Sequence, residues 1–431
     1  MKFLVDAWSA GARAGSLILG ELQLETPCLL MLTKKGLPAH ITQDMLDDLQ
    51  TEGRAMQISP IEFLESPPPK VVAAVGGVHK YLYLKKSIIV AVARNQFGLE
   101  ADGLNGTKFG ASFETSAGRR VVGPTKYMEA VNALRPDIWA SLPDEVPAWA
   151  TPKRHRMAVD RTLQWLDECL SLNAVQDDKV LGVVVGGASV EERKRSALET
   201  ARRDVSGFSL SGFGLGENHD ERGELLKSII DNLPEEKVRH ISGLGMPEEV
   251  LEGVAAGVDL FDSTYPHTLT MKGFAMVFPL SMEKQNGYYL EKKNGHHLSN
   301  GDMKKKNGFH VSNGETAGVY LDPSKLDMRS YIHRLDTNPI VKGCQCYACR
   351  KHSRAYIHHL LNVHEMLAQT LLDIHNYHHY FSFFRAIRES IAQDKFESFR
   401  NWFTSRSYDN TTVDPATYKE SYMDGLLLAK N

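Results

Sequence analysis

The chain has 431 residues, of which 42% are hydrophobic, and this is enough to form a large core. Its 50 lysines and arginines nearly balance its 53 aspartates and glutamates, which gives a net charge of −3. This balance excludes a protein that is basic over its whole surface, so any nucleic-acid site must be a local face. The sequence has no run of about 18 apolar residues that could span a membrane.

Short apolar runs alternate along the chain with longer amphipathic stretches. The runs are continuous, without alternating polar residues, which is typical of strands buried on both faces. Eight such strands with intervening helices predict a (β/α)8 TIM barrel, with an open doubly wound sheet as the alternative. The predicted strands are 28–33, 55–59, 87–93, 137–141, 179–185, 207–211, 238–242 and 258–261.

Several of the stretches between these runs carry helix-start signals. Ser189 precedes Glu192 by three residues, which predicts a capping box at the start of a helix. Two other stretches begin with proline, which is tolerated in the first turn of a helix. The predicted helices are 124–134, 155–172, 190–202 and 247–256.

Three of the five cysteines lie within six residues, at Cys344, Cys346 and Cys349. A secreted disulfide framework would spread an even number of cysteines along a short chain, so this grouping indicates a reducing compartment and a metal. Zinc needs four ligands in a tetrahedron, and seven histidines from His352 to His379 could each complete the set. The N-terminus is too polar for a signal peptide, so we predict a cytoplasmic protein.

The C-terminal part of the chain differs in character from the predicted barrel. Five Asn-Gly pairs and a run of three lysines mark a polar insertion at 283–318, and such a run is more typical of a solvated loop than of a nucleic-acid contact. Two helices are predicted over 353–373 and 376–392. The predicted domains are the barrel with its insertion over 1–335, a zinc-binding helical subdomain packed on it over 336–403, and a polar tail over 404–431.

The sequence KHSRAYIHHL at 351–360, followed by the His-Asn pair at 375–376, closely resembles the zinc region of the tRNA-guanine transglycosylases. The resemblance covers roughly residues 159–403. It implies a zinc-containing (β/α)8 barrel, with Cys344, Cys346, Cys349 and His375 as the zinc ligands. Further family-like motifs occur in the family's order: RTLQW at 161–165, GVVVGG at 182–187, GFSLSGFGLGE at 207–217, GLGMPE at 243–248 and GVDLFD at 257–262.

Members of this family exchange a guanine base in tRNA for a deazaguanine such as queuine. Base exchange needs a carboxylate nucleophile to hold the ribose covalently, an acid/base group, and polar groups that read the purine edge. The family's nucleophile is the second aspartate of its GVDMFD motif. Asp262 stands at that position, immediately after the eighth predicted strand, at the barrel end where active sites lie.

The other parts of this machinery are missing from the matching positions. The acid/base motif DSGGFQ corresponds to 93–97, which contains no carboxylate, and the purine-reading glutamine is replaced by Val185. The PTR motif reads Pro-His-Thr at 266–268, so the arginines expected to engage the tRNA backbone are absent. Ser211-Gly212 replaces a glycine doublet. Asp144 lies one position out of register with a purine-binding aspartate.

This combination resembles the non-catalytic branch of the family, which pairs with a catalytic paralogue as a heterodimeric queuine tRNA-ribosyltransferase. The resemblance implies that the complex exchanges guanine for queuine at the wobble position of tRNAs with GUN anticodons. This chain would support dimer formation and tRNA binding, with one structural zinc ion and Asp262 as a relic. It also implies a peripheral position on the mitochondrial outer membrane, besides the cytoplasm.

Three alternatives remain open at this point. The chain could be a divergent active transglycosylase with Asp262 as its nucleophile. It could be a stand-alone tRNA-binding barrel without an enzyme partner. A zinc barrel adapted to another small base is a third reading, although the loss of glutamine at Val185 argues against recognition of a purine edge.

Overall fold

The computed structural model describes residues 1–49, 54–64, 66–84, 86–95, 100–101, 106–115, 118–174, 179–282 and 324–408. The predicted insertion at 283–318 lies outside these residues, as does the tail beyond residue 408. Among the described helices, none has the length and apolar character needed to cross a membrane.

Eight parallel strands form a closed barrel, and each of them coincides with one of the eight predicted apolar runs. Closure is made by pairing between the first and last barrel strands, where Leu260 lies opposite Cys28. The TIM-barrel prediction is therefore confirmed, and the open sheet is excluded. The barrel strands are β4 Cys28–Leu32, β5 Ala55–Ile58, β6 Ile88–Ala91, β10 Ile138–Ala140, β11 Val180–Val184, β12 Gly207–Leu210, β13 Val238–Ile241 and β14 Leu260–Asp262.

Helices surround this barrel, and the four predicted ones are present with only small shifts in their ends. The Ser189 side chain caps α6 by accepting a hydrogen bond of 3.2 Å from the backbone N–H of Glu192, as predicted. The helical segments between the barrel strands are α1 Gln43–Asp48, η2 Pro60–Leu64, α2 Pro69–Val75, α3 Val78–Tyr81, α4 Pro124–Leu134, α5 Pro152–Leu172, α6 Val190–Ala201, α7 His219–Ile230 and α8 Pro247–Ala256.

An N-terminal antiparallel sheet, absent from the sequence prediction, covers the end of the barrel where its strands begin. Arg13 on its middle strand is fully buried and forms a two-bond ion pair with Asp259, which directly precedes β14. Arg13 also donates to the carbonyls of Glu235 and Lys237, just before β13. The sheet therefore covers the N-terminal ends of the barrel strands. Its strands are β1 Lys2–Ser9, β2 Ala12–Leu19 and β3 Leu22–Thr26, and a second small sheet contains β7 Glu100–Ala101, β8 Ala111–Thr115 and β9 Gly118–Val122.

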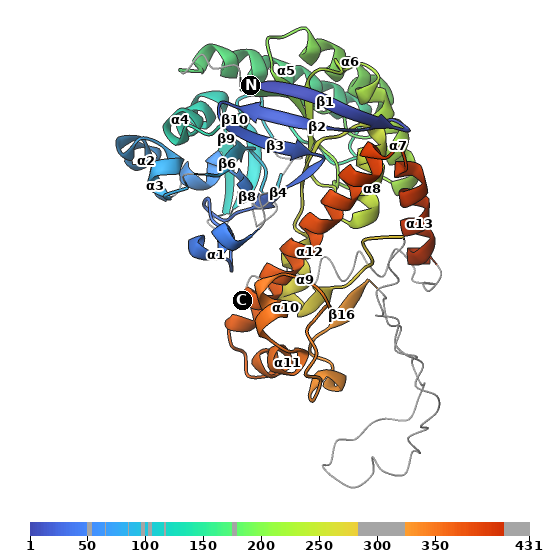
Figure 1. Cartoon of the computed structure of the whole chain (residues 1–431). Coiled ribbons are helices and arrows are strands. Elements are labelled where there is room, and N and C mark those ends of the chain that lie inside the picture. The colour runs from blue at the N-terminus through green and yellow to red at the C-terminus, as the bar shows by residue number, and fades with distance from the viewer. Residues whose placement is uncertain are drawn as a thin grey trace, which may run out of the picture.

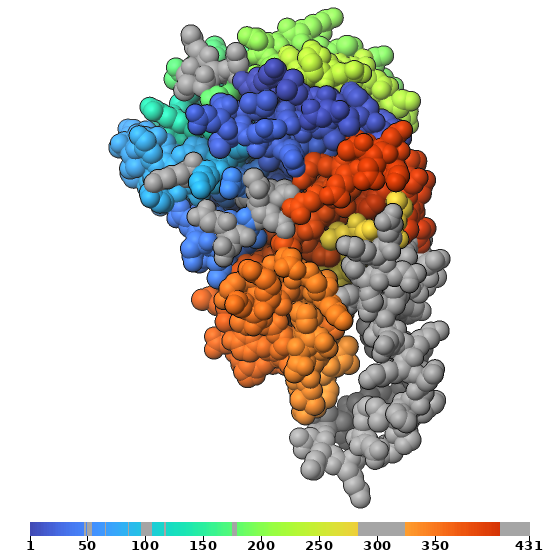
Figure 2. Space-filling model, in the orientation of Figure 1, coloured from blue at the N-terminus to red at the C-terminus, as the bar shows by residue number. Residues whose placement is uncertain are grey.

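The C-terminal elements are coloured from yellow through orange to red, and their orange part, 325–366, forms a lobe that projects from the barrel (Figures 1 and 2). The long helix α12 begins in this lobe and runs back along the barrel, where it contacts β1, β2 and β4 (Figure 1). The elements are α9 Tyr265–Met271, β15 Phe274–Met276, β16 Lys325–Asp327, η3 Tyr331–His333, α10 Tyr347–Lys351, α11 Arg354–Asn362, α12 Leu367–Ala392 and α13 Phe396–Tyr408.

The helix break in this region differs from the sequence prediction. We expected a break near 374–375, but α11 ends at Asn362 and α12 is continuous from Leu367 onward. The chain turns at His364, whose positive φ of 59° lies in the left-handed region that ends helices. His375 consequently lies inside a helix, where the backbone restricts its position. Residues 404–408 of the predicted tail belong to α13.

Candidate metal centre and barrel mouth

Three cysteines converge on a tight turn that leads into α10. Gly343 takes a positive φ of 84°, which turns the chain directly before Cys344. Cys346 is the N-cap residue of α10, and its sulfur accepts a hydrogen bond of 3.3 Å from the backbone N–H of Cys349. The turn and the first helical turn together bring the three sulfurs to one point.

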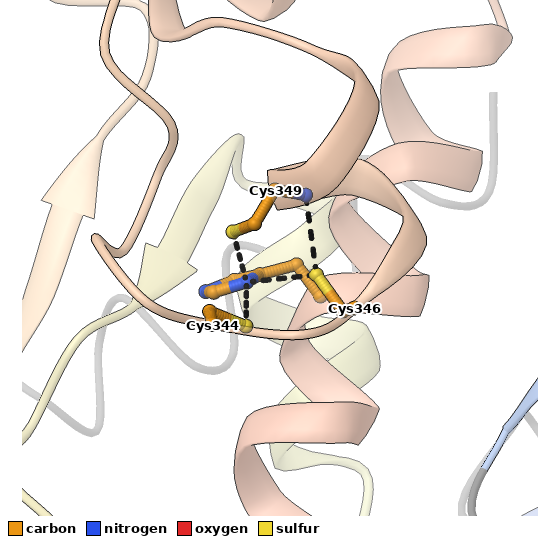
Figure 3. A group of neighbouring side chains, drawn as sticks. Cys344, Cys346 and Cys349 are labelled. Carbon is orange, nitrogen blue, oxygen red and sulfur yellow. Dashed lines mark hydrogen bonds between the residues drawn. The ribbon is translucent and has the colours of Figure 1, made fainter.

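The three cysteine side chains point toward one another (Figure 3), and His375 of α12 completes the group. Its Nδ1 lies 3.9 Å from Cys344 Sγ, 3.6 Å from Cys346 Sγ and 3.4 Å from Cys349 Sγ. A tetrahedral ion with bonds of about 2.3 Å to sulfur and 2.0 Å to nitrogen would separate these ligand atoms by about 3.6 Å. The group therefore fits a four-coordinate metal ion without rearrangement.

The surroundings prepare His375 and the thiols for this role. His375 is fully buried, and its Nε2 lies 2.8 Å from the carbonyl oxygen of Met276 in β15. Since only a protonated Nε2 can donate to a carbonyl, the lone pair of Nδ1 is directed at the sulfurs. Hydrogen bonds among the three cysteines lower the pKa of the Cys344 thiol and raise that of the Cys346 thiol, so one thiolate is favoured and a metal ion would displace the remaining protons.

Asp262 lies at the upper end of β14, as predicted, but its carboxylate is buried and engaged. Gln57 Nε2 donates to its Oδ2 over 3.1 Å, and the backbone N–H of Gly243 donates to Oδ1 over 3.0 Å. Only 1% of Asp262 is exposed. A nucleophile has to reach the ribose carbon, whereas these contacts hold both oxygens inside the protein.

Arg94 and Glu145 occupy the neighbouring part of the barrel mouth. Arg94 belongs to the segment that replaces the acid/base motif, and its guanidinium donates over 3.0 Å to the carbonyl of Phe213. Its Nε lies 3.5 Å from Glu145 Oε1, which also accepts a hydrogen bond of 2.8 Å from the N–H of Gly212. The side chains of Arg94 and Glu145 are 6% and 1% exposed, so an internal ion pair lies where a substrate-binding group would be needed.

The purine-edge position is apolar, and an arginine lies beside it. Val185 is 2% exposed and packs in the apolar barrel interior. Arg193 from α6 is fully buried and donates to the carbonyls of Ser211 and Gly212, each over 3.1 Å. Its guanidinium also lies 3.9 Å from the centre of the Phe213 ring. The carbonyl groups of Ser211 and Gly212 are therefore already hydrogen-bonded to Arg193 of the same chain. Arg193 has no distinctive sequence motif, and the sequence analysis did not find it.

Asp144 is occupied by two arginines. Arg154 forms two hydrogen bonds with its carboxylate, of 2.7 and 2.8 Å, and Arg161 adds a third of 3.2 Å. The Asp144 side chain is 2% exposed. These contacts explain Asp144 as an anchor between the loop after β10 and α5, and they leave little acceptor capacity for a purine.

Residues 266–268 lie in the first turn of helix α9. His267 contacts helix α12, and this position does not suit a phosphate anchor. His267 Nδ1 lies 3.7 Å from Asp373 Oδ2 on α12, and its ring stacks on that of His40. Neither His40 nor Asp373 was singled out by the sequence analysis, since they are 333 residues apart in sequence and neither belongs to a family motif.

The fold and the site together define a class: a (β/α)8 barrel protein with a Cys3His group, able to hold a metal ion, on an appended helical lobe. Residues 7–409 match the family model described as queuine tRNA-ribosyltransferase. The chain belongs to this family. The match extends to the N-terminal region, upstream of residue 159, where sequence motifs were faint.

Curated relatives match almost the whole chain. Queuine tRNA-ribosyltransferase accessory subunit 2 of Xenopus laevis is 34% identical over 410 residues, which cover 92% of this chain and 98% of the relative. The protein of the same name from Homo sapiens is 35% identical over 384 residues, covering 87% and 91%. That from Trichoplax adhaerens is 32% identical, covering 93% and 98%.

Proposed function

We propose that this chain is the non-catalytic accessory subunit of a heterodimeric queuine tRNA-ribosyltransferase. In this proposal a catalytic paralogue exchanges guanine for queuine at the wobble position of tRNAs with GUN anticodons. The present chain supports dimer formation and tRNA binding. A peripheral position on the mitochondrial outer membrane remains a prediction from the resemblance.

The observation that carries the proposal is the internal occupation of the barrel mouth. Asp262 is held by Gln57 and Gly243, and Arg94 is paired with Glu145. A purine pocket would need these polar groups free to face a ligand, because recognition depends on donors and acceptors that the protein leaves unsatisfied. The loss of the acid/base motif agrees with a site that no longer performs base exchange.

We propose zinc as the ion of the Cys3His group, bound by Cys344, Cys346, Cys349 and His375. Three thiolates with one imidazole are a typical closed structural zinc set, with no position open to a substrate. The ion would connect the turn around Cys344 to α12, and α12 continues onto the barrel.

The lobe offers surfaces that suit both proposed partners. Arg350 and Lys351 are exposed beside the stacked rings of His352 and Tyr356, on a shallow groove. Cations next to aromatic rings suit a phosphate backbone and its bases. Exposed apolar side chains lie in and just after η3 and in the α11–α12 turn, and we propose that they contact the catalytic paralogue, since exposed apolar surface can mark an interaction site. They are Tyr331, Ile332, Leu335, Val363 and Met366.

The experiment that tests the function measures incorporation of labelled guanine or queuine into tRNA. The full chain is assayed alone, then with a catalytic paralogue, then with that paralogue and a heat-unfolded sample of this chain. We expect no incorporation by the chain alone and incorporation only in the mixture with folded chain.

The alternative function is a divergent active transglycosylase, favoured by Asp262 at the nucleophile position. Turnover by the chain alone would establish that alternative and overturn the accessory proposal. Retention of tRNA without binding to the paralogue would instead support the stand-alone tRNA-binding barrel.

A further inference from the structure

A second group of metal-ligand side chains lies apart from the cysteines. His40, His267 and Asp373 each offer one ligand atom, and these atoms lie within 4.8 Å of one another. The three residues come from the loop after β4, from α9 and from α12. Helices α9 and α12 contact each other, and α9 directly follows the last barrel strand β14 (Figure 1), so the group lies where the barrel meets the lobe.

The carboxylate of Asp373 makes this group unusual. Asp373 is 1% exposed, and neither of its oxygens has a hydrogen-bond partner in the described part of the chain. An ionised carboxylate buried without partners costs several kcal/mol, so such groups are normally paired or bound to a metal. His267 Nδ1 lies 3.7 Å from Asp373 Oδ2, which is beyond hydrogen-bond distance.

The two histidines complete a suitable ligand set. Their rings lie 5.4 Å apart between centroids and are almost parallel, at 13°. Burial is the largest influence on the pKa of His40 and lowers it, while Asp373 raises it and His267 lowers it. His40 Nε2 also contacts the sulfur of Met271 at 3.3 Å.

We propose that His40, His267 and Asp373 bind one divalent transition-metal ion, separate from the ion of the Cys3His group. Two imidazoles and a carboxylate suit borderline ions such as Zn²⁺, Fe²⁺ or Co²⁺, with remaining positions filled by water. Neighbouring ligand atoms around such an ion are about 3.0–3.4 Å apart, close to the His267–Asp373 separation. The ion would connect the loop after β4 to α9 and α12, and so fix the lobe on the barrel.

Helix α12 would then carry ligands for two ions. Asp373 and His375 are two positions apart, which places their side chains roughly 200° apart around the helix. Asp373 faces α9 and the loop after β4, whereas His375 faces the three cysteines. This arrangement lets the two sites be examined independently in one chain.

The test uses the full chain loaded with zinc, to which Co²⁺ is added as the probe. We measure metal per chain by mass spectrometry, the visible absorption of bound Co²⁺, and the thermal unfolding midpoint. The variants are Asp373→Asn and His267→Ala, with His359→Ala as the control because His359 is exposed outside both groups.

We expect two ions per wild-type chain, with the second giving Co²⁺ absorption without the charge-transfer bands of thiolate ligands. Both site variants should bind this ion at least about 100-fold more weakly, since even changes outside the ligand set cost roughly 10–100-fold. His359→Ala should behave as wild type. These readouts are metal content, Co²⁺ absorption and thermal stability rather than base exchange, so this result is distinct from a test of the proposed function.

A buried imidazolium–carboxylate pair predicts a different result. The wild type would then bind a single ion, added Co²⁺ would not raise its unfolding midpoint, and Asp373→Asn would unfold at a lower temperature without any change in metal content. That outcome would overturn the proposal.

Discussion

Asp262 shows how a residue can keep its position while its surroundings change. In this chain the carboxylate accepts hydrogen bonds from Gln57 and Gly243 and is closed off from solvent. His240 lies on the neighbouring strand, where burial lowers its pKa to about 4 against the opposing charge of Asp262. A neutral His240 does not form an ion pair with Asp262, whose contacts are the hydrogen bonds from Gln57 and Gly243.

The substitution Asp262→Asn separates the two enzymatic readings. In an accessory subunit the mixture with the catalytic paralogue should keep its activity within about 2-fold, because the amide retains the shape of the carboxylate and loses only charge-assisted hydrogen bonds worth ~1–2 kcal/mol. The initial rate of guanine incorporation measures this. A matched change of the nucleophile in the paralogue serves as the control, and loss of all activity in the Asp262→Asn mixture would favour the active-enzyme alternative.

At the scale of single elements, the sequence predicted helix starts correctly where they depend on residues close together in the chain. Ser189 caps α6 as predicted, although Glu192 binds Arg195 at 2.6 Å and does not return to the cap. Of the two hydrogen bonds in a capping box, the one from the backbone N–H of Glu192 to the Ser189 side chain formed. The carboxylate of Glu192, which would make the other, binds Arg195 instead. A cap requires only the chain within three residues, while an arginine partner depends on the helix surface.

The cap on α6 gives a prediction for stability. Ser189→Ala should lower the free energy of unfolding by ~1 kcal/mol, because the N–H of Glu192 loses its acceptor. Chemical denaturation followed by circular dichroism measures the change. Ser171→Ala is the control, since that exposed hydroxyl bonds only to a carbonyl in its own helix. Equal effects of the two substitutions would show that the Ser189 cap contributes nothing specific.

At the scale of the whole molecule, α12 links the metal centre to the barrel. It carries His375 at one end, and its other half packs aromatic side chains against the barrel and α13, including Phe384 on Phe261 and Phe383 on Phe403. Loss of the ion should therefore destabilise the packing of α12 as well as the cysteine turn.

If the proposed zinc ion is bound, Cys346→Ser should remove it and unfold the C-terminal third of the chain, since such sites contribute on the order of 10 kcal/mol to folding. Zinc content and limited proteolysis of the lobe measure both effects. Gln345→Ala is the control, because Gln345 lies in the same turn and its side chain bonds only to the backbone of Gly343. Wild-type zinc content and protease resistance in Cys346→Ser would contradict the metal assignment.

The sequence by itself determined the barrel strands, the helix caps and the three cysteines, because each depends on residues close together in the chain. Burial on both faces makes strands such as 180–184 continuously apolar whatever their partners are. His375 could be selected only through the family resemblance, since seven histidines were compositionally equivalent.

The tertiary structure alone decided which distant groups meet. The pairing of Arg94 with Glu145, the three carbonyl contacts of Arg193 with Gly187, Ser211 and Gly212, and the meeting of His40, His267 and Asp373 all join separate elements. The N-terminal sheet was missed for the same reason. It is held over the N-terminal ends of the barrel strands by the buried Arg13–Asp259 pair, whose members are 246 residues apart in sequence. Contacts of this kind arise from the closed barrel, which no local pattern encodes.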